Sequence, residues 1–294
     1  ICKSLKLDAK PLLIGEAVVA DVGGMVFAIS SIPNIMVISA SGMGFIQFFL
    51  VSFPLSLILL FATILMVRRF FPLAYIEEGG VVERLDEWSV VKDRRAFWRS
   101  AAVLCLTIGL FFVSDYLPVS LDIIALCGAI TILLLTSHSM KDALREVDWE
   151  ILIFFAGLFI MVWGLGKVGF FSFVGSGIKS LSGGSLFAES SILFTVTSIT
   201  SALVDDIPMV AAMIPVVSSL SSSVLLWFVL LFSLNLGGSL LPLGSPSTVI
   251  TIGIARNEGI FISSKEYIKK GGAVALVQLA IALLYVFMLV PFFA

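Results

Sequence analysis

The sequence contains little charge. Asp, Glu, Lys and Arg make up only 13% of its 294 residues, whereas soluble domains carry about 25%. Hydrophobic residues account for 59% of the chain, and the mean hydropathy is +1.13. This composition excludes an ordinary soluble domain. It predicts an all-α polytopic membrane protein whose surroundings are the lipid bilayer, and we expect it in the cell (inner) membrane.

Residues that commonly bind metals are also scarce. The only histidine, His138, lies in a polar loop, and Cys2, Cys105 and Cys127 are far apart without metal-ligand spacing. The net charge of -2 argues against a nucleic-acid partner. The Tyr-Asp and Gly-x-Gly-Asp motifs of intramembrane aspartyl proteases are absent. We therefore expect no metal site, no cofactor, no nucleic acid and no enzymatic activity.

Uncharged runs mark the candidate membrane spans, because crossing a bilayer takes ~20 apolar residues in a helix. Uninterrupted spans are expected over 44–67, 97–116, 119–136, 150–166 and 271–293. Two other segments, 11–38 and 224–255, are long enough to cross but are broken near the middle by Gly, Ser and Pro. A third, 189–220, is broken at Asp205-Asp206-Ile207-Pro208.

The basic residues orient the chain through the positive-inside bias. If 189–220 is a re-entrant hairpin, 16 of the 18 Lys and Arg lie inside, and only Lys167 and Lys179 lie outside. If it is a full crossing, the tally becomes 12 to 6. The hairpin topology is favoured, with seven crossings, one hairpin and the C-terminus outside.

On this topology the chain has three parts. Residues 1–67 form the end of a first repeat, 68–99 a charged cytoplasmic linker, and 100–294 a second repeat. Within the second repeat, 167–182 is an amphipathic connector that suits a helix lying in the membrane interface. The polar opening residues read like the exit from an earlier helix, so we expect an N-terminal part of the protein to be missing.

The two broken helices predict an internal repeat. DVGGMVFAISSIPNIMVIS from Asp21 aligns with NLGGSLLPLGSPSTVITIG from Asn235 at an offset of 214 without a gap. The two copies lie in the first and the sixth of the seven crossings, so they run in opposite directions. Inverted repeats of this kind are common in secondary transporters, and paired interrupted helices point to a site near the bilayer midplane. A channel is disfavoured because such repeats suggest alternating access.

Breaks in a membrane helix need partners for the freed backbone groups, which protein, water or an ion supplies. Glycine permits close backbone approach, and proline removes a donor. The residues expected at the breaks are Gly23, Gly24, Pro33, Pro208, Gly237, Gly238 and Pro246. Neutral oxygens and donors for a bound ion are expected from Ser30, Ser31, Asn34, Asn235, Ser245, Ser247 and Thr248.

The embedded carboxylates are the principal site candidates. Asp206 is followed by 49 residues, Ile207 to Ala255, without charge. A charged Asp at a membrane-helix centre costs roughly 2.5–3.5 kcal/mol, so Asp205, Asp206 and Asp21 are expected to bind a proton or cation. Glu16 is a candidate for proton coupling. The alternative is that the hairpin pair caps the following helix, with Asp206 as the N-cap.

Three stretches resemble the ArsB/NhaD permeases of the ion transporter superfamily, which include arsenite permeases, NhaD-type Na+/H+ antiporters and the melanosomal P protein. They are VDWEILIFFAGLFIMVWGLGKVG from Val147, SALVDDIPMVAAMIPVV from Ser201 and LGGSLLPLGSPSTVITIGIARNEGIFISSKEYIKKG from Leu236. The resemblance implies an elevator-like transporter, often dimeric, with a first hairpin upstream of this chain. Asp21 and Asp206 stand where the family usually has Asn.

The resulting hypothesis is a proton-coupled secondary transporter of a small inorganic ion, similar to a Na+/H+ antiporter. Export of arsenite, another metalloid or an anion is the alternative. A carboxylate carrier is the third hypothesis, and VDDIP lacks the Ser-Asn-Thr hairpin typical of those carriers.

Overall fold

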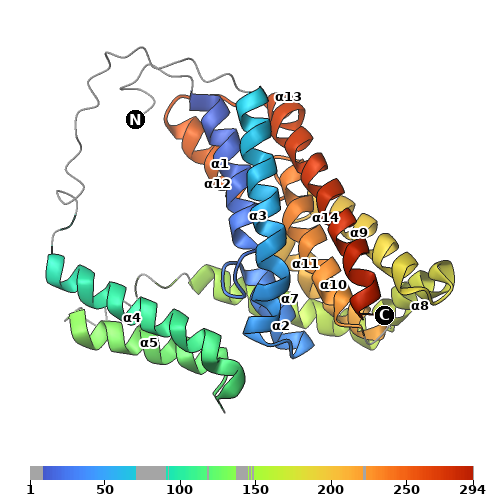
Figure 1. The fold of residues 1–294 in the computed structure, drawn as a ribbon, viewed down its shortest axis with the longest axis horizontal. Helices are drawn as coiled ribbons and strands as arrows, with labels where there is room; N and C mark the ends of the chain where they lie inside the picture. The colour runs from blue at the N-terminus through green and yellow to red at the C-terminus, as the bar shows by residue number, and fades with distance from the viewer. Residues whose placement is uncertain are drawn as a thin grey trace. The chain divides into compact units, whose positions relative to one another are not determined.

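A computed structural model describes residues 9–70, 91, 93–117, 119–136, 145, 147, 149–220 and 223–293. Every regular element in these parts is a helix, as Figure 1 shows, so the prediction of an all-α polytopic membrane protein is confirmed. The opening residues 1–8, most of the predicted linker and the loop containing His138 lie outside the described residues. Four of the described helices are long and apolar enough to cross a membrane: Phe45–Arg69, Arg94–Tyr116, Leu186–Leu203 and Ser264–Phe293.

The helices fall into two compact units. The smaller unit contains α4 (Arg94–Val113) and α5 (Leu121–Thr136), which pack against each other. Asp93 caps α4, and the hydrogen bonds that it accepts from the Ala96 and Arg95 N–H groups hold the pKa of its carboxyl below the usual value. Asp115, in the short turn η2 (Ser114–Tyr116), accepts hydrogen bonds from the N–H groups of Phe45 and Ile46 at 2.9 and 3.1 Å.

The larger unit contains both predicted broken helices. The first consists of α1 (Ala9–Gly24) and α2 (Ile32–Ser41), followed by the long α3 (Phe45–Phe70). Ser31 caps α2 by accepting a hydrogen bond from the Asn34 N–H, and Pro33 fits the first turn because its missing N–H needs no partner there.

The second broken helix consists of α11 (Leu225–Gly237), the short turn η3 (Gly238–Leu240) and α12 (Pro246–Asn257). It is followed by α13 (Ser264–Tyr267), the π-helical turn η4 (Ile268–Gly272) and α14 (Ala273–Phe293). Here too a serine, Ser245, stands at the start of the second half, and a proline occupies the first turn.

The predicted hairpin consists of α9 (Leu186–Leu203) and α10 (Asp206–Ser219), which follow α7 (Trp149–Lys167) and α8 (Phe170–Ser182). The axes of α7 and α8 bend by 65°. α8 packs against α10, with Gly175 against Ser219 near the end of that helix. Because α8 also leads into α9, α10 returns to the end at which α9 begins.

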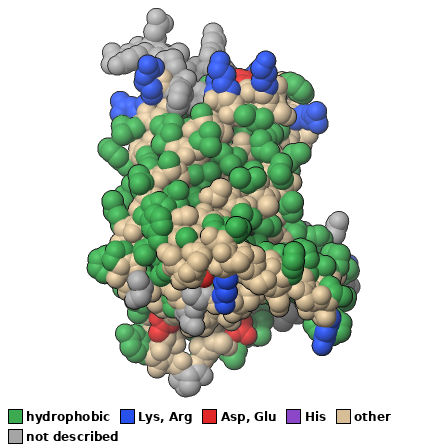
Figure 2. Space-filling view, turned by 90° about the vertical axis from the view of Figure 1, so that its right-hand side faces the viewer, with side chains coloured by type: hydrophobic (Ala, Val, Ile, Leu, Met, Phe, Trp, Pro, Cys, Tyr) green, Lys and Arg blue, Asp and Glu red, His purple; other side chains and the backbone are tan. Residues whose placement is uncertain are grey.

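The two broken helices run in opposite directions within this unit. α1 lies beside α12, and α2 lies beside α10 and α11 (Figure 1). Asp21 near the end of α1 contacts Ser245 and Ser247 at the start of α12, so the two breaks lie next to each other. Figure 2 shows a broad band of hydrophobic side chains, with most of the visible Lys and Arg side chains at the upper end and others below the band.

Candidate functional site

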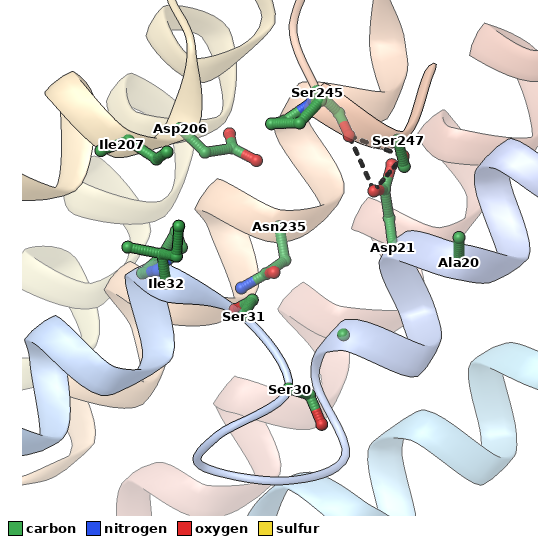
Figure 3. Close-up of a pocket in the computed structure, with 13 residues that line it drawn as sticks. Ala20, Asp21, Ser30, Ser31, Ile32, Asp206, Ile207, Asn235, Ser245 and Ser247 are labelled. Carbon is green, nitrogen blue, oxygen red and sulfur yellow. Dashed lines mark hydrogen bonds between the residues drawn. The ribbon is translucent and has the colours of Figure 1, made fainter. Parts of the chain in front are cut away.

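A cavity of about 300 Å³ lies where the hairpin tip meets the two breaks. Figure 3 shows Asp206 and Asn235 pointing into the space between these segments. The helices α2, α10 and α12 all begin at this cavity. The lining consists of Ala20, Asp21, Gly24, Ser30, Ser31, Ile32, Pro33, Asp206, Ile207, Asn235, Ser245, Pro246 and Ser247.

Asp21 is surrounded by hydroxyl groups from the second broken helix. Its Oδ1 accepts hydrogen bonds from Ser245 Oγ at 2.7 Å and from Ser247 Oγ at 2.6 Å. Its Oδ2 accepts a hydrogen bond from Ser239 Oγ in η3. Three hydroxyl donors stabilise an ionised carboxylate, and their oxygens also offer lone pairs to a cation.

Asp206 is more deeply buried, with 6% of its surface exposed. Its Oδ1 lies 2.5 Å from Ser201 Oγ, in the last turn of α9. Its neighbour Asp205 is exposed and caps α10, accepting a hydrogen bond from the Ile207 N–H at 3.0 Å. Both aspartates were predicted to bind, with Asp206 as the N-cap in the alternative. That alternative is wrong about the cap, because Asp205 caps α10 and Asp206 lines the cavity.

The two asparagines join the breaks to each other. Asn235 Nδ2 donates to the Leu231 carbonyl at 2.9 Å and to Asn34 Oδ1 at 3.3 Å. Asn34 Nδ2 in turn donates to the carbonyl oxygens of Gly24 and Phe27, at 2.8 and 3.0 Å. Asn34 thus satisfies backbone groups that the first break leaves free, as a membrane interior requires.

The electrostatics of the cavity are unusual for an anion site. Two carboxylates line it, and the described lining residues include no Lys, Arg or His. The N-terminal ends of α2, α10 and α12 contribute partial positive charge, while α1 and α11 end there with partial negative charge. In the described parts, no group of three or more His, Cys, Asp and Glu is placed to hold a metal ion.

The structure brings together most of the residues predicted from sequence. The predicted residues in the lining are Asp21, Gly24, Ser30, Ser31, Pro33, Asp206, Asn235, Ser245, Pro246 and Ser247. Asn34 lies behind this lining, and Thr248 Oγ1 lies 3.0 Å from the hydroxyl of buried Tyr267. Asp205 and Glu16 are exposed and do not line the cavity.

The remaining predicted residues lie at the breaks outside the lining. Gly23 is exposed near the end of α1, and Pro208 lies in the first turn of α10. Gly237 packs against backbone: a Cβ there would lie 2.6 Å from the Ser198 carbonyl oxygen. Gly238 packs closely against Asp206: a Cβ on Gly238 would lie 3.0 Å from Asp206 Oδ1.

Sequence reasoning missed three residues. Ser239 follows the predicted Gly-Gly pair, and Ser201 precedes the hairpin carboxylates by one helical turn, so their positions carried a weak signal. No local sequence feature marks Tyr267. Its hydroxyl donates to the Ser239 carbonyl oxygen at 3.1 Å, and the tertiary fold alone brings these two residues together. Tyr267 is fully buried and supports the turn that carries Ser239.

Comparison with known proteins places the chain in a family. The profile of the family described as "Citrate transporter" matches residues 1–231. An uncharacterized transporter of Mycobacterium bovis is 31% identical over 297 residues, covering 98% of this chain and 69% of that protein. A 46 kDa membrane protein of Mycobacterium leprae is 29% identical over 298 residues, with coverages of 98% and 70%.

The P protein of Mus musculus is 27% identical over 373 residues, covering 97% of this chain but only 45% of the P protein. This match confirms the resemblance to the permease group that includes the P protein. Together with the apolar helices and the cavity at the two helix breaks, these matches show that the chain belongs to the citrate transporter family of membrane transporters.

Proposed function

We propose that the protein is a secondary active transporter that exchanges a small cation, Na+ in the simplest case, for protons. The observation that carries this proposal is the cavity in which Asp21 and Asp206 meet hydroxyl oxygens without a basic side chain in the described lining. Oxygen-rich sites with carboxylates suit hard cations, and broken membrane helices commonly coordinate Na+ or protons.

The energetics of burial support exchange. Two carboxylates in a membrane interior cannot both stay ionised without compensation, because desolvation and mutual repulsion disfavour the second charge. Either a proton or a cation removes the penalty. When both ligands compete for the same pair of carboxylates, binding of one releases the other, which is the requirement for antiport.

Alternating access of the elevator type accounts for the arrangement of the larger unit. The hairpin α9–α10 and the two broken helices surround the cavity, and α3 and α14 are long unbroken helices. In this proposal the hairpin and broken helices move together, while other spans form a scaffold in a homodimer. The basic end of the larger unit faces the cytoplasm and the C-terminus lies outside.

Transport of a carboxylate such as citrate is the second candidate. It is favoured by the description of the family profile and by the three helix N-termini at the cavity, which can bind anionic groups. The two carboxylates weigh against it, since they would repel a polyanion that arrives without a cation.

The test uses the full protein in liposomes with a trapped pH dye, to which Na+, Li+, K+, citrate or arsenite is added in turn. We expect Na+ or Li+ to drive proton movement that Asp21→Asn and Asp206→Asn abolish. Asp205→Asn is the matched control and should keep activity, because Asp205 is exposed and outside the lining. Citrate or arsenite flux without any cation response would reject the exchange of cations for protons.

A further inference from the structure

The two carboxylates have different hydrogen-bond partners, and this difference assigns them different tasks. The inference rests on the proposed function and extends it to the path of the proton. It starts from Ser201, whose Oγ lies 2.5 Å from Asp206 Oδ1 and 2.9 Å from the carbonyl oxygen of Leu234 in α11. Ser201 is fully buried.

A hydroxyl group has one hydrogen to donate and lone pairs to accept with. The Leu234 carbonyl can only accept, so Ser201 must donate to form that hydrogen bond. Its contact with Asp206 is then a hydrogen bond only if Asp206 donates, which requires a protonated carboxyl. If Asp206 is ionised, Ser201 must instead turn its hydrogen toward Asp206 and give up the bond to Leu234.

Asp21 is less constrained, because it has three hydroxyl partners, Ser239, Ser245 and Ser247. Ser247 Oγ also lies 2.8 Å from Ser245 Oγ and 3.4 Å from the Ala17 carbonyl oxygen, but its 2.6 Å contact with Asp21 is the shortest of the three, so all three hydroxyls can donate to an ionised Asp21. An ionised carboxylate accepts up to about four hydrogen bonds. The three hydroxyl groups can therefore satisfy most of the acceptor capacity of Asp21 without a proton on it. Its two oxygens and the neighbouring serine oxygens also form the more oxygen-rich side of the cavity.

We infer that Asp206 is the residue that carries the exchanged proton, that Asp21 is the ionised cation ligand, and that Ser201 is a positioning residue that links the proton on Asp206 to α11. When the proton leaves, the electron pair of the O–H bond remains on the Asp206 carboxylate. Ser201 then rotates its hydrogen from Leu234 to Asp206. No other co-reactant is needed.

This rotation changes the attachment of the hairpin to the second broken helix. With Asp206 protonated, Ser201 in α9 is bonded to Leu234 in α11, and the two helices pack closely along their length. With Asp206 ionised, this link is lost. Leu234 keeps a partner, because its carbonyl oxygen also accepts the Gly238 N–H. In both protonation states of Asp206, the Ser201 hydroxyl and the Leu234 carbonyl oxygen each keep a hydrogen-bond partner. The proton on Asp206 decides whether Ser201 bonds to Leu234 or to Asp206.

Few charged groups influence this switch. Of the described titratable residues, Asp21 faces Asp206 across the cavity and Asp205 precedes it in the chain. The other described residues of the cavity lining, including those of α2 and α12, are Ala, Gly, Ser, Ile, Pro and Asn. Ser201 and Gly238, which pack against the Asp206 carboxyl, add no charge. The protonation of Asp206 should consequently respond to the occupancy of Asp21, since a cation there removes one negative charge.

The inference is tested first without transport, by infrared difference spectroscopy of the full protein in lipid at neutral pH. We expect a protonated carboxyl band that disappears in Asp206→Asn and persists in Asp21→Asn and Asp205→Asn. Ser201→Ala should shift its frequency. Ser198→Ala is the matched control, because Ser198 is buried in the same helix but donates to Phe194 at 2.7 Å. A band lost in Asp21→Asn instead, or no such band, would overturn the assignment.

The second arm measures the pH dependence of exchange. Hydrogen bonds to charged groups are stronger than neutral ones, so loss of Ser201 penalises the ionised form more. Ser201→Ala should move the half-maximal pH upward by roughly one unit, a tenfold change in proton concentration, and Ser201→Thr should restore it. An unchanged profile overturns the role of Ser201. If the unmodified protein exchanges no cation, the proposed function fails, while the infrared result still decides the protonation of Asp206.

Discussion

At the scale of single residues, the serines around Asp21 give the cation site its expected affinity. Ser247→Ala removes a hydroxyl that donates to Asp21 at 2.6 Å. A hydrogen bond to a charged group contributes about 1.5–3 kcal/mol, so we expect the apparent KM for the cation to rise by tenfold or more, measured as initial rates in liposomes. Ser30→Ala is the control, because Ser30 lines the same cavity but its hydroxyl oxygen accepts a hydrogen bond from the nearby Phe27 N–H, at 3.3 Å. Equal effects of both substitutions would contradict a specific role for Ser247.

Two glycines at equivalent places in the breaks should differ in their tolerance of a side chain. At Gly238 a Cβ would lie 2.8 Å from the Gly244 carbonyl oxygen and 3.0 Å from Asp206 Oδ1. At Gly24 the nearest atom would be 3.8 Å away. Gly238→Ala should therefore abolish exchange and lower the melting temperature, whereas Gly24→Ala should change neither appreciably. Thermal melting in detergent and flux in liposomes measure both. A Gly238→Ala protein with normal exchange would contradict the close packing of Gly238 against Gly244 and Asp206.

The site residues that could be predicted from sequence are those that stand out locally. Asp21 and Asp206 are visible as charges in apolar surroundings, and the break serines are visible beside Gly and Pro. Ser201 and Tyr267 could not be assigned, because serine is common in membrane helices and a buried tyrosine has no local mark. Which of two adjacent aspartates caps α10 depends on the backbone: Asp205 adopts an extended ψ of 141° and Asp206 is already helical.

At the scale of secondary-structure elements, α8 should hold the C-terminal end of α10 in place through the contact of Gly175 with Ser219. A Cβ on Gly175 would overlap the Ser219 hydroxyl of α10, whereas one on Gly177 would meet nothing within 4 Å. Gly175→Leu should separate α8 from α10, lower the melting temperature and reduce exchange. Gly177→Leu, on the same helix, should leave both unchanged. If the two variants behave alike, contact between α8 and α10 does not support the hairpin.

The break positions were predictable at this scale, since Gly-Gly and Ser-Pro pairs end and start helices by local chemistry. The π-helical turn Ile268–Gly272 was not. It forms where the chain packs tightly: a Cβ on Gly272 would lie 2.9 Å from the Leu240 carbonyl oxygen. Such packing is a property of the assembled elements and leaves no local pattern in the sequence.

At the scale of the whole molecule, the repeat detected at an offset of 214 has a counterpart in the contacts. Asp21 of the first copy bonds to serines of the second break, and the aligned Asn235 of the second copy bonds to Asn34 of the first break. The alignment predicted that the breaks are equivalent. It did not predict that each copy contacts the loop of the other, because identity between the copies is too low to indicate which side chains meet.

The topology makes a prediction that separates the hairpin from a full crossing at 189–220. In a variant without Cys2, Cys105 and Cys127, single cysteines are placed at Lys265 and Phe173. Phe173 is 77% exposed, and Lys265 lies in α13 at the basic end of the larger unit. If 189–220 is a hairpin, a membrane-impermeant thiol reagent added to intact cells labels Phe173→Cys, and it labels Lys265→Cys only after the membrane is opened. If the segment crosses fully, one crossing more separates α8 from α13, and both cysteines lie on the same side. Labelling of both from outside would therefore reject the hairpin, and with it the placement of Asp206 at the tip of a segment that enters and leaves the same face of the bilayer.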